Sequence, residues 1–274
     1  MDSFFGYSNN GDFMRVLITG ATSGIGYELG KNLAKRGHMV YLSTHTLEQL
    51  KYLEEKVNRD GIVATCFKMD ITTDDINKVD DLELDCLINH ASIGMGGSIL
   101  YMDMECLREN YEVNVFSSFK LLKKVYNNME NRNIPGKIFV TSSLASMLPI
   151  PFLGCYTSSK AAISMLVMTI KEELKYIDSN ISISLIEPGA YHTGFNQVMI
   201  DNKDKYLEKD NIIYKNKELI NINQRRLFNL VESRNYDSLI NNIVKQVESN
   251  NPKFKIRAPF IQRLFVKLYV IFTR

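Results

Sequence analysis

Short apolar runs alternate with segments of helical periodicity along most of this chain. The runs have the length and residue types of buried strands, and they fall at 14–19, 40–43, 63–69, 84–89, 137–142, 181–186 and 253–258. Between them, apolar residues recur at helical spacing over 24–36, 46–59, 103–128, 156–177 and 237–248. This alternation predicts an α/β fold with a parallel sheet of about seven strands and helices on both faces.

Size and composition narrow the class of protein further. The 274 residues suit one large domain, and an apolar fraction of 45% suffices for its core. The net charge of +2 gives no indication of a nucleic-acid partner. The four cysteines form no C-x-x-C pair and lie at no ligand spacing from a histidine, so we expect no metal site. Such cysteines are typical of a reducing compartment.

The beginning of the chain lacks the features of a targeting segment. Residues 1–13 are polar, without the basic and apolar regions of a signal peptide, and are expected to form a flexible leader. No stretch reaches the roughly 20 apolar residues that would span a bilayer. We therefore expect a cytoplasmic protein whose residues 14–274 form a single domain.

A glycine-rich segment joins the first expected strand to the first helix. It runs Thr19-Gly20-Ala21-Thr22-Ser23-Gly24-Ile25-Gly26, with the spacing G-x-x-x-G-x-G. Glycine allows a tight turn, close approach of the backbone to a pyrophosphate, and close packing of helix on strand. The start of the helix presents free N–H groups and the positive end of its dipole to phosphates. Three glycines would also fit an ordinary strand–helix turn, but their position after the first strand favours a nucleotide site.

The end of the second strand bears on which nicotinamide cofactor would bind. Proteins that take NAD commonly place an acid there, whereas this chain has Leu42-Ser43-Thr44-His45. Hydroxyl groups and a cation would accept a ribose 2′-phosphate, so we expect NADP(H) rather than NAD(H), with Thr44 and His45 as contacts. A solvated surface histidine is the alternative for His45.

Three side chains suit acid–base chemistry on a carbonyl group. Tyr156 and Lys160 lie four residues apart at the start of a long expected helix, and therefore on one face of it. A phenol is a poor base at neutral pH because its unperturbed pKa is near ~10, and an adjacent ammonium lowers that pKa. Ser143 follows the strand at 137–142, at the edge of the sheet where ligands bind, and its hydroxyl could donate to a carbonyl oxygen. Taken separately, an exposed Tyr–Lys pair and a turn serine are the ordinary alternatives.

These features together resemble the short-chain dehydrogenase/reductase family, in its short single-domain branch. The resemblance extends from about residue 14 to the C-terminus. The motifs that carry it appear in the family's order: residues 19–26, Asp70, Asn89-His90-Ala91-Ser92, Asn114, Ser143, Tyr156 with Lys160, and Pro188-Gly189 with Thr193. It implies a Rossmann-like doubly wound sheet and an NAD(P)-dependent oxidoreductase, which moves a hydride reversibly between a nicotinamide and a carbonyl or alcohol carbon.

The resemblance also implies where a cofactor would be held. Asp70 would bond the adenine amino group beside the backbone of Ile71, and Asn89 and Ala91 would line the adenosine ribose. Thr193 would bond the nicotinamide carboxamide. The full set of expected cofactor contacts is Gly20, Thr22, Ser23, Gly24, Ile25, Gly26, Thr44, His45, Asp70, Ile71, Asn89, Ala91, Tyr156, Lys160, Pro188, Gly189 and Thr193.

The resemblance further implies that four residues would carry the catalysis. Tyr156 would transfer the proton, Ser143 would orient the substrate oxygen, and Lys160 would grip the nicotinamide ribose. Asn114 would help to hold a water that relays protons to Lys160. A non-catalytic NAD(P)-binding sensor on the same fold is the alternative, and the presence of all four residues favours the enzyme.

Two histidines lie within or beside these motifs. The family's N-N-A-G appears here as Asn89-His90-Ala91-Ser92, where Ser92 adds a side chain near the cofactor and His90 is expected to be a structural substitute. His192 precedes Thr193, and it is expected either to touch the cofactor or substrate or to lie on the loop surface.

The polar segment at about 190–236 interrupts the strand–helix rhythm and is expected to be a substrate loop or lid. Segments that border the substrate cleft in relatives carry apolar residues here, which indicates an apolar pocket. They are Met95, Met147, Leu148, Phe152, Leu153, Phe195 and Met199. Because the segments 146–156 and 188–195 are most similar to hydroxysteroid and retinol dehydrogenases, we expect a steroid-, retinoid- or lipid-like substrate. Packing of the lid is the alternative role for these residues.

The end of the chain, at about 259–272, has apolar residues at helical spacing with basic residues between them, and is expected to form an amphipathic helix. We favour its packing on its own domain or on a subunit partner over binding to a membrane surface. Relatives associate through their two long helices, here 103–128 and 156–177, so the resemblance implies a homodimer or homotetramer.

Overall fold

The described strands form one parallel sheet. The computed structural model describes residues 13–202, 212–260, 262–264 and 266. Across this part of the chain the strand order is β3-β2-β1-β4-β5-β6-β7, and every neighbouring pair is parallel. The strands are β1 Arg15–Ile18, β2 Met39–Thr44, β3 Thr65–Lys68, β4 Cys86–Asn89, β5 Lys137–Thr141, β6 Ser182–Glu187 and β7 Lys255–Arg257. The predicted doubly wound sheet is confirmed, and its order reverses between β1 and β4, where such sheets bind ligands.

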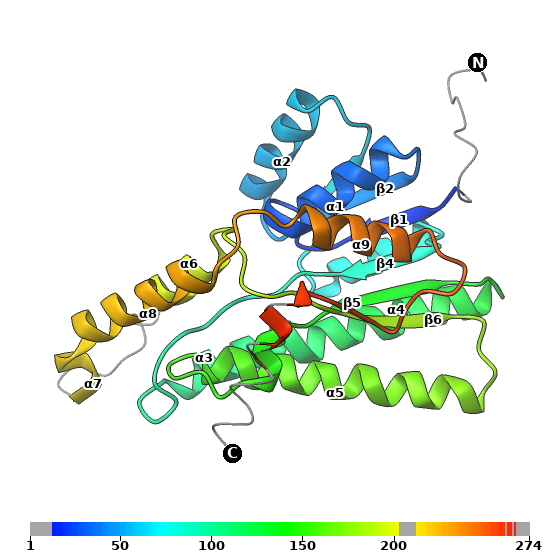
Figure 1. Cartoon of the computed structure of the whole chain (residues 1–274). Helices are drawn as coiled ribbons and strands as arrows, with labels where there is room; N and C mark the ends of the chain where they lie inside the picture. Colours follow the sequence, from blue (N-terminus) through cyan, green and yellow to red (C-terminus); the bar gives the residue numbers. More distant parts are fainter. Residues whose placement is uncertain (1–12, 203–211, 261, 265, 267–274) are drawn as a thin grey trace.

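Helices cover both faces of the sheet (Figure 1). One face carries α1 Gly24–Lys35, α2 Leu47–Arg59 and α9 Asp237–Val247, whose buried residues share a core with β1 and β2. The other carries α4 Ser118–Asn131 and α5 Gly154–Tyr176 over a second core. Local chemistry explains one boundary well: Thr46 and Gln49 form a capping box that begins α2. A short 3-10 helix, η1 Asp74–Asp81, lies between β3 and β4.

The single helix expected at 103–128 consists of three segments. They are α3 Met104–Tyr111, the π-helical turn η2 Glu112–Ser117, and α4. The wide turn carries Asn114, whose amide bonds to the backbone of Ile93 on a neighbouring loop. Such turns often occur at functional sites, and apolar periodicity does not reveal them.

The polar segment expected as a lid is largely helical. It forms α6 Phe195–Asn202, α7 Ile212–Lys215 and α8 Lys217–Val231, which extend away from the sheet (Figure 1). The chain returns to the body through a bridge between Tyr191 and Ser233. The two ends of the lid are therefore adjacent in space.

The predictions for the chain ends fall mostly outside the described residues. Residues 1–12 of the leader expected at 1–13 lie outside them, and so does much of the helix expected at 259–272, of which 260, 262–264 and 266 are described as helical. Val266 is buried with Leu144 and Ala258, which agrees with packing on the domain, whereas Phe260 and Leu264 are exposed. Over the described ranges, no helix is long and apolar enough to cross a membrane.

Candidate active site

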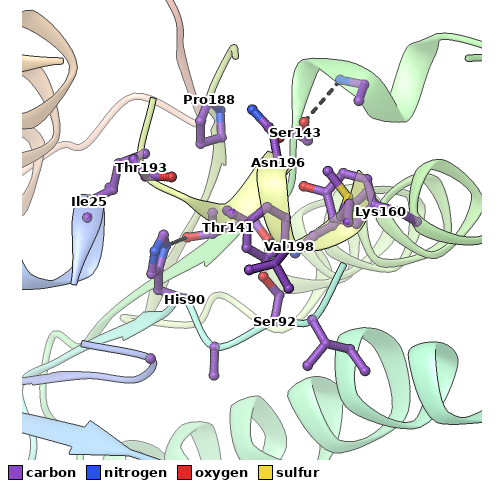
Figure 2. A pocket seen from close by; sticks show the side chains of 18 of the residues that line it. Ile25, His90, Ser92, Thr141, Ser143, Lys160, Pro188, Thr193, Asn196 and Val198 are labelled. Carbon is purple, nitrogen blue, oxygen red and sulfur yellow. Dashed lines mark hydrogen bonds between the residues drawn. The ribbon is translucent and has the colours of Figure 1, made fainter. Parts of the chain in front are cut away.

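A cavity of about 1220 Å³ lies at the carboxyl ends of the strands. It is larger than the roughly 300–1,000 Å³ typical of a small-molecule pocket, and so has room for two ligands. It brings together most of the residues predicted from the sequence: Gly20, Thr22, Ser23, Gly24, Ile25, Thr44, His45, Asp70, Ile71, Ala91, Ser143, Tyr156, Lys160, Pro188, Gly189 and Thr193. Figure 2 shows Ile25 and Thr193 on one side of this pocket and Lys160 and Ser143 on the other.

The glycine loop leaves a bare backbone surface at one end of the cavity. Gly20 has φ +66°, and a Cβ there would lie 2.8 Å from Cα of Ala91. Gly24 has φ +58° and faces the side chain of Thr193. Ser23 precedes α1 without capping it through its side chain, so the first N–H groups of the helix have no side-chain partner there. This cradle fits the pyrophosphate of a dinucleotide. Gly26 lies outside the lining and instead allows α1 to pack against Gly20 and His90.

Three residues shape the end where the adenosine would lie. His45 Nε2 is 3.2 Å from Asp70 Oδ2, and His45 is exposed at the rim. Burial opposes ionisation of Asp70, but hydrogen bonds from Thr72 and the charge of His45 hold its pKa below the usual value. Asp70 and His45 thus place a carboxylate and an imidazole side by side at the cavity edge.

Ser143, Tyr156 and Lys160 converge on the middle of the cavity. Ser143 follows β5 and begins the short 3-10 helix η3 Leu144–Met147, where its Oγ accepts a hydrogen bond from the N–H of Ala145 at 3.1 Å (Figure 2). That bond uses the oxygen and leaves the hydroxyl proton to donate. Tyr156 and Lys160 lie one turn apart on α5, and Lys160 Nζ is 5.8 Å from the centre of the Tyr156 ring. The same Nζ donates to the carbonyl oxygen of Thr141 at 3.1 Å.

Burial dominates the electrostatics of this pair. Desolvation raises the pKa of Tyr156 to about 12, while a hydrogen bond with Ser143 acts in the opposite direction. Desolvation lowers the pKa of Lys160 to about 7. The sequence led us to expect that the ammonium would lower the phenol pKa. Instead, burial of the phenol determines the direction of its pKa shift, and the opposing contribution comes from Ser143 rather than from Lys160. Burial therefore favours the neutral form of both groups.

Asn114 and Asn89 both form hydrogen bonds to other segments of the chain. Both are buried outside the cavity lining. Asn114 Oδ1 accepts from the N–H of Ile93 at 2.9 Å and Nδ2 donates to Ser159 Oγ at 3.1 Å, so this amide joins the loop after β4 to α5. Asn89 Nδ2 donates to the carbonyl oxygen and hydroxyl of Ser118 at 2.8 and 3.0 Å, so it anchors α4, and its contact with a cofactor ribose stays a prediction. The water-holding role of Asn114 stays a prediction.

One buried residue of this network was missed. Asn110 is 0% exposed, and Asn114 Nδ2 lies 3.1 Å from its side-chain oxygen. It lies one turn before Asn114 on the same helix face. That spacing was the available signal, but a polar residue within a helix is usually solvated and gave no reason to select it.

The two histidines have separate environments. His90 Nδ1 lies 3.1 Å from Thr141 Oγ1 (Figure 2), and desolvation together with the charge of Lys160 lowers the pKa of His90 to about 4. Its imidazole lines the cavity in neutral form and supports the loop, which agrees with a structural substitute. His192 is 55% exposed, lies outside the cavity lining, and bonds to Glu232.

The remaining end of the cavity is mainly apolar. Of the residues predicted there, Leu148, Leu153, Phe195 and Met199 line it, whereas Met95, Met147 and Phe152 do not. Met147 is exposed on the surface, and Met95 is buried elsewhere. Further apolar side chains that sequence reasoning missed also line it: Ile150 and Val198 from the same segments, and Phe228, Val231 and Val266 from distant ones. Phe228 and Val231 belong to α8, whose polar composition concealed its buried face.

A parallel α/β sheet with a glycine-rich cradle at its switch point defines a dinucleotide-binding protein. A sequence model of the family described as short chain dehydrogenase matches residues 14–204. This chain belongs to the short chain dehydrogenase family, whose members are NAD(P)-dependent dehydrogenases and reductases.

Curated relatives include three enzymes. The chain is 31% identical to an NADPH-dependent 3-dehydrocapnine reductase of Ornithobacterium rhinotracheale, over 65% of this chain and 65% of that protein. It is 29% identical to retinol dehydrogenase 8 of Bos taurus, over 68% of this chain and 62% of that protein. In both, the match spans less than two thirds of the relative's length. A 3-ketodihydrosphingosine reductase of Bacteroides thetaiotaomicron is 27% identical over 92% of this chain and 90% of its own.

Solved structures of the family share the fold. A short chain dehydrogenase/reductase from Burkholderia phymatum in complex with NAD superposes with a TM-score of 0.75 at 19% identity, covering 97% of this chain and 94% of that one. A short-chain dehydrogenase from Sphingobium yanoikuyae in complex with NADPH gives 0.69 at 20% identity, covering 94% of each chain. At these identities the likeness establishes the fold alone.

Proposed function

We propose that this protein is an NADP(H)-dependent oxidoreductase that transfers a hydride between the nicotinamide and the carbonyl or alcohol carbon of an apolar substrate. The convergence of Ser143, Tyr156 and Lys160 on one cavity carries the proposal. Ser143 would donate a hydrogen bond to the substrate oxygen, and Tyr156 would give that oxygen a proton during reduction. Lys160, with its lowered pKa, would hold the nicotinamide ribose and assist proton exchange at the phenol.

The apolar end of the cavity supports a lipid-like substrate. Its lining beyond Tyr156 consists mainly of aliphatic and aromatic side chains of η3, α6, α8 and the segment after β7, with the polar Asn196 and Gln262 among them. Two relatives are named for retinol and for 3-ketodihydrosphingosine, both molecules with long hydrocarbon parts. A steroid-, retinoid- or other lipid-like ketone or alcohol is therefore the substrate class that we propose.

His45 supports the choice of NADP(H). It lies at the cavity rim after β2, where an acid would repel a 2′-phosphate, and Thr44 lines the same end. A protonated imidazole there would attract the phosphate, in competition with Asp70 at 3.2 Å.

We also propose a homo-oligomer. The long helix α5 leaves Met165 61% exposed and Leu166 38% exposed, and Phe116 of η2 is 58% exposed. Apolar side chains on long helices commonly become buried when subunits associate. Light scattering coupled to size-exclusion chromatography would test this, and a monomer at micromolar concentration would contradict it.

A cofactor and substrate screen tests the enzymatic proposal. The purified chain would be mixed with NADPH or NADH and with all-trans-retinal, androstenedione or 3-ketodihydrosphingosine, with glucose as a polar control. We expect loss of reduced-nicotinamide absorbance with NADPH and one of the apolar carbonyl compounds. Activity confined to small sugars or polyols would contradict the substrate class. Binding of NADPH without turnover of any substrate would instead favour a sensor.

A further inference from the structure

The carboxylate of Glu232 lies where the lid returns to the body of the protein. Its side chain is only 3% exposed, although it follows the last residue of α8. Oε1 accepts a hydrogen bond from Asn196 Nδ2 at 2.7 Å, and Oε2 lies 2.8 Å from His192 Nδ1. Gln197 Nε2 approaches the two oxygens at 3.4 and 3.3 Å. A buried carboxylate with several partners fixes their positions, because leaving it unpaired is costly.

These partners belong to two segments that border the cavity. His192 directly precedes Thr193, which lines the cavity. The backbone N–H of His192 donates to the carbonyl oxygen of Ser233 at 3.1 Å. Asn196 and Gln197 lie in the first turn of α6. One side chain thus joins the loop after β6, the start of α6 and the end of α8.

The first turn of α6 also contacts the proposed proton donor. The ring of Phe195 packs against the ring of Tyr156, with centroids 5.6 Å apart and planes tilted by 58°. Asn196, Val198 and Met199 of the same helix line the cavity. A shift of α6 would therefore change both the packing of the phenol and the wall of the apolar end.

We propose that Glu232 is a positioning residue, which holds the first turn of α6 so that Phe195 packs on Tyr156 and α6 closes the apolar end of the cavity. Glu232 lies outside the cavity lining and acts through Asn196 and Gln197. The inference rests on the proposed function only in that Tyr156 is taken as the proton donor. The attachment of α6 by Glu232 can be measured without any turnover.

The lid offers a matched control. Arg225 of α8 and Asp201 of α6 form an ion pair between the same two helices, but these side chains are 52% and 56% exposed. The variants Glu232→Ala, Glu232→Gln and Asp201→Ala would be compared in the full chain. Hydrogen–deuterium exchange of residues 195–202 would be followed with NADPH present, with α9 as an internal reference. The kcat and KM would be measured with NADPH and all-trans-retinal, and the Kd for NADPH by its fluorescence.

Glu232→Ala is expected to raise exchange in α6 by about tenfold or more, because hydrogen bonds to a charged group are lost, while α9 is unchanged. The kcat/KM for retinal should fall by a similar factor, with the Kd for NADPH changed less than about threefold. Glu232→Gln should have a smaller effect because it keeps one acceptor oxygen, and Asp201→Ala should match the wild type.

The proposal would be overturned if α6 of Glu232→Ala exchanged at the wild-type rate. It would also be overturned if Asp201→Ala raised α6 exchange as much as Glu232→Ala does. If Glu232→Ala does not fold, Asn196→Ala removes the same contact from the α6 side and must raise α6 exchange; unchanged exchange there also overturns it. A wild-type protein that oxidises no NADPH with any carbonyl compound of the screen would contradict the proposed function, and the exchange result would still decide the role of Glu232.

Discussion

His90 Nδ1 lies 3.1 Å from the hydroxyl oxygen of Thr141, and the carbonyl oxygen of that threonine accepts a hydrogen bond from Lys160 Nζ at the same distance. The histidine that replaces an asparagine of the family motif is therefore joined to the buried lysine through one residue. A positive charge on His90 would be unfavourable in this buried place beside Lys160. Burial and the charge of Lys160 lower the pKa of His90, which keeps the imidazole neutral.

Replacing His90 with asparagine should change stability at acid pH. The pKa of His90 falls from 6.5 to about 4 on folding, so the unfolded chain takes up the proton first as the pH falls. The free energy of unfolding should thus decrease between about pH 6.5 and 4, by up to roughly 3 kcal/mol from this group. His90→Asn should lack that part of the decrease. Urea denaturation at several pH values would measure it, and identical pH dependence in both proteins would contradict it.

Replacing Tyr156 with phenylalanine should remove the proposed proton donor and leave the fold intact. The phenol is only 8% exposed, and its ring would still pack against Phe195. We expect kcat to fall by roughly 10²–10⁴, the range for loss of a general acid, while the Kd for NADPH changes little. Stopped-flow measurement with NADPH and the best carbonyl compound of the screen would show this. Undiminished turnover would mean that another group transfers the proton.

Local patterns allowed much of this fold to be predicted. Apolar runs located the strands because strands buried on both faces need continuous apolar sequence. The capping box of Thr46 and Gln49 marked the start of α2 because its bonds are made within four residues. The motif positions Ser143, Tyr156 and Lys160 were likewise fixed by single strand ends and helix turns, and the structure brings them together.

Contacts between distant segments were the part that could not be predicted. Asn89 matches a motif, yet its amide bonds to Ser118 of α4, and nothing near residue 89 indicates that partner. Glu232 and Asn196 are 36 residues apart, in a polar segment where a buried carboxylate is not expected. Such pairs become visible only when the path of the chain in space is known.

The choice of cofactor should depend on His45. An arginine there would bind a 2′-phosphate with two hydrogen bonds and a permanent charge, so His45→Arg should tighten NADPH binding by about tenfold and leave NADH binding nearly unchanged. His45→Gln keeps a polar side chain that cannot become charged and should weaken NADPH binding alone. Fluorescence titrations with both nucleotides would test this at fixed ionic strength. Equal shifts for NADPH and NADH would show that His45 does not contact the 2′-position.

Adding one methyl group at Gly94 should displace the lid. A Cβ at this position would lie 2.2 Å from Met199 Cγ and 3.1 Å from Phe195 Cε1, so α6 or the Met199 side chain must move. Overpacking of this kind costs about 1–3 kcal/mol, and we expect Gly94→Ala to lower kcat/KM for the apolar carbonyl compound by about tenfold. Methionine is flexible, but its sulfur would also lie only 2.7 Å from the new atom. Met199→Ala provides the missing space, so the double variant should regain activity that Gly94→Ala loses. A double variant no better than Gly94→Ala would place the defect in the loop after β4 rather than in its contact with α6.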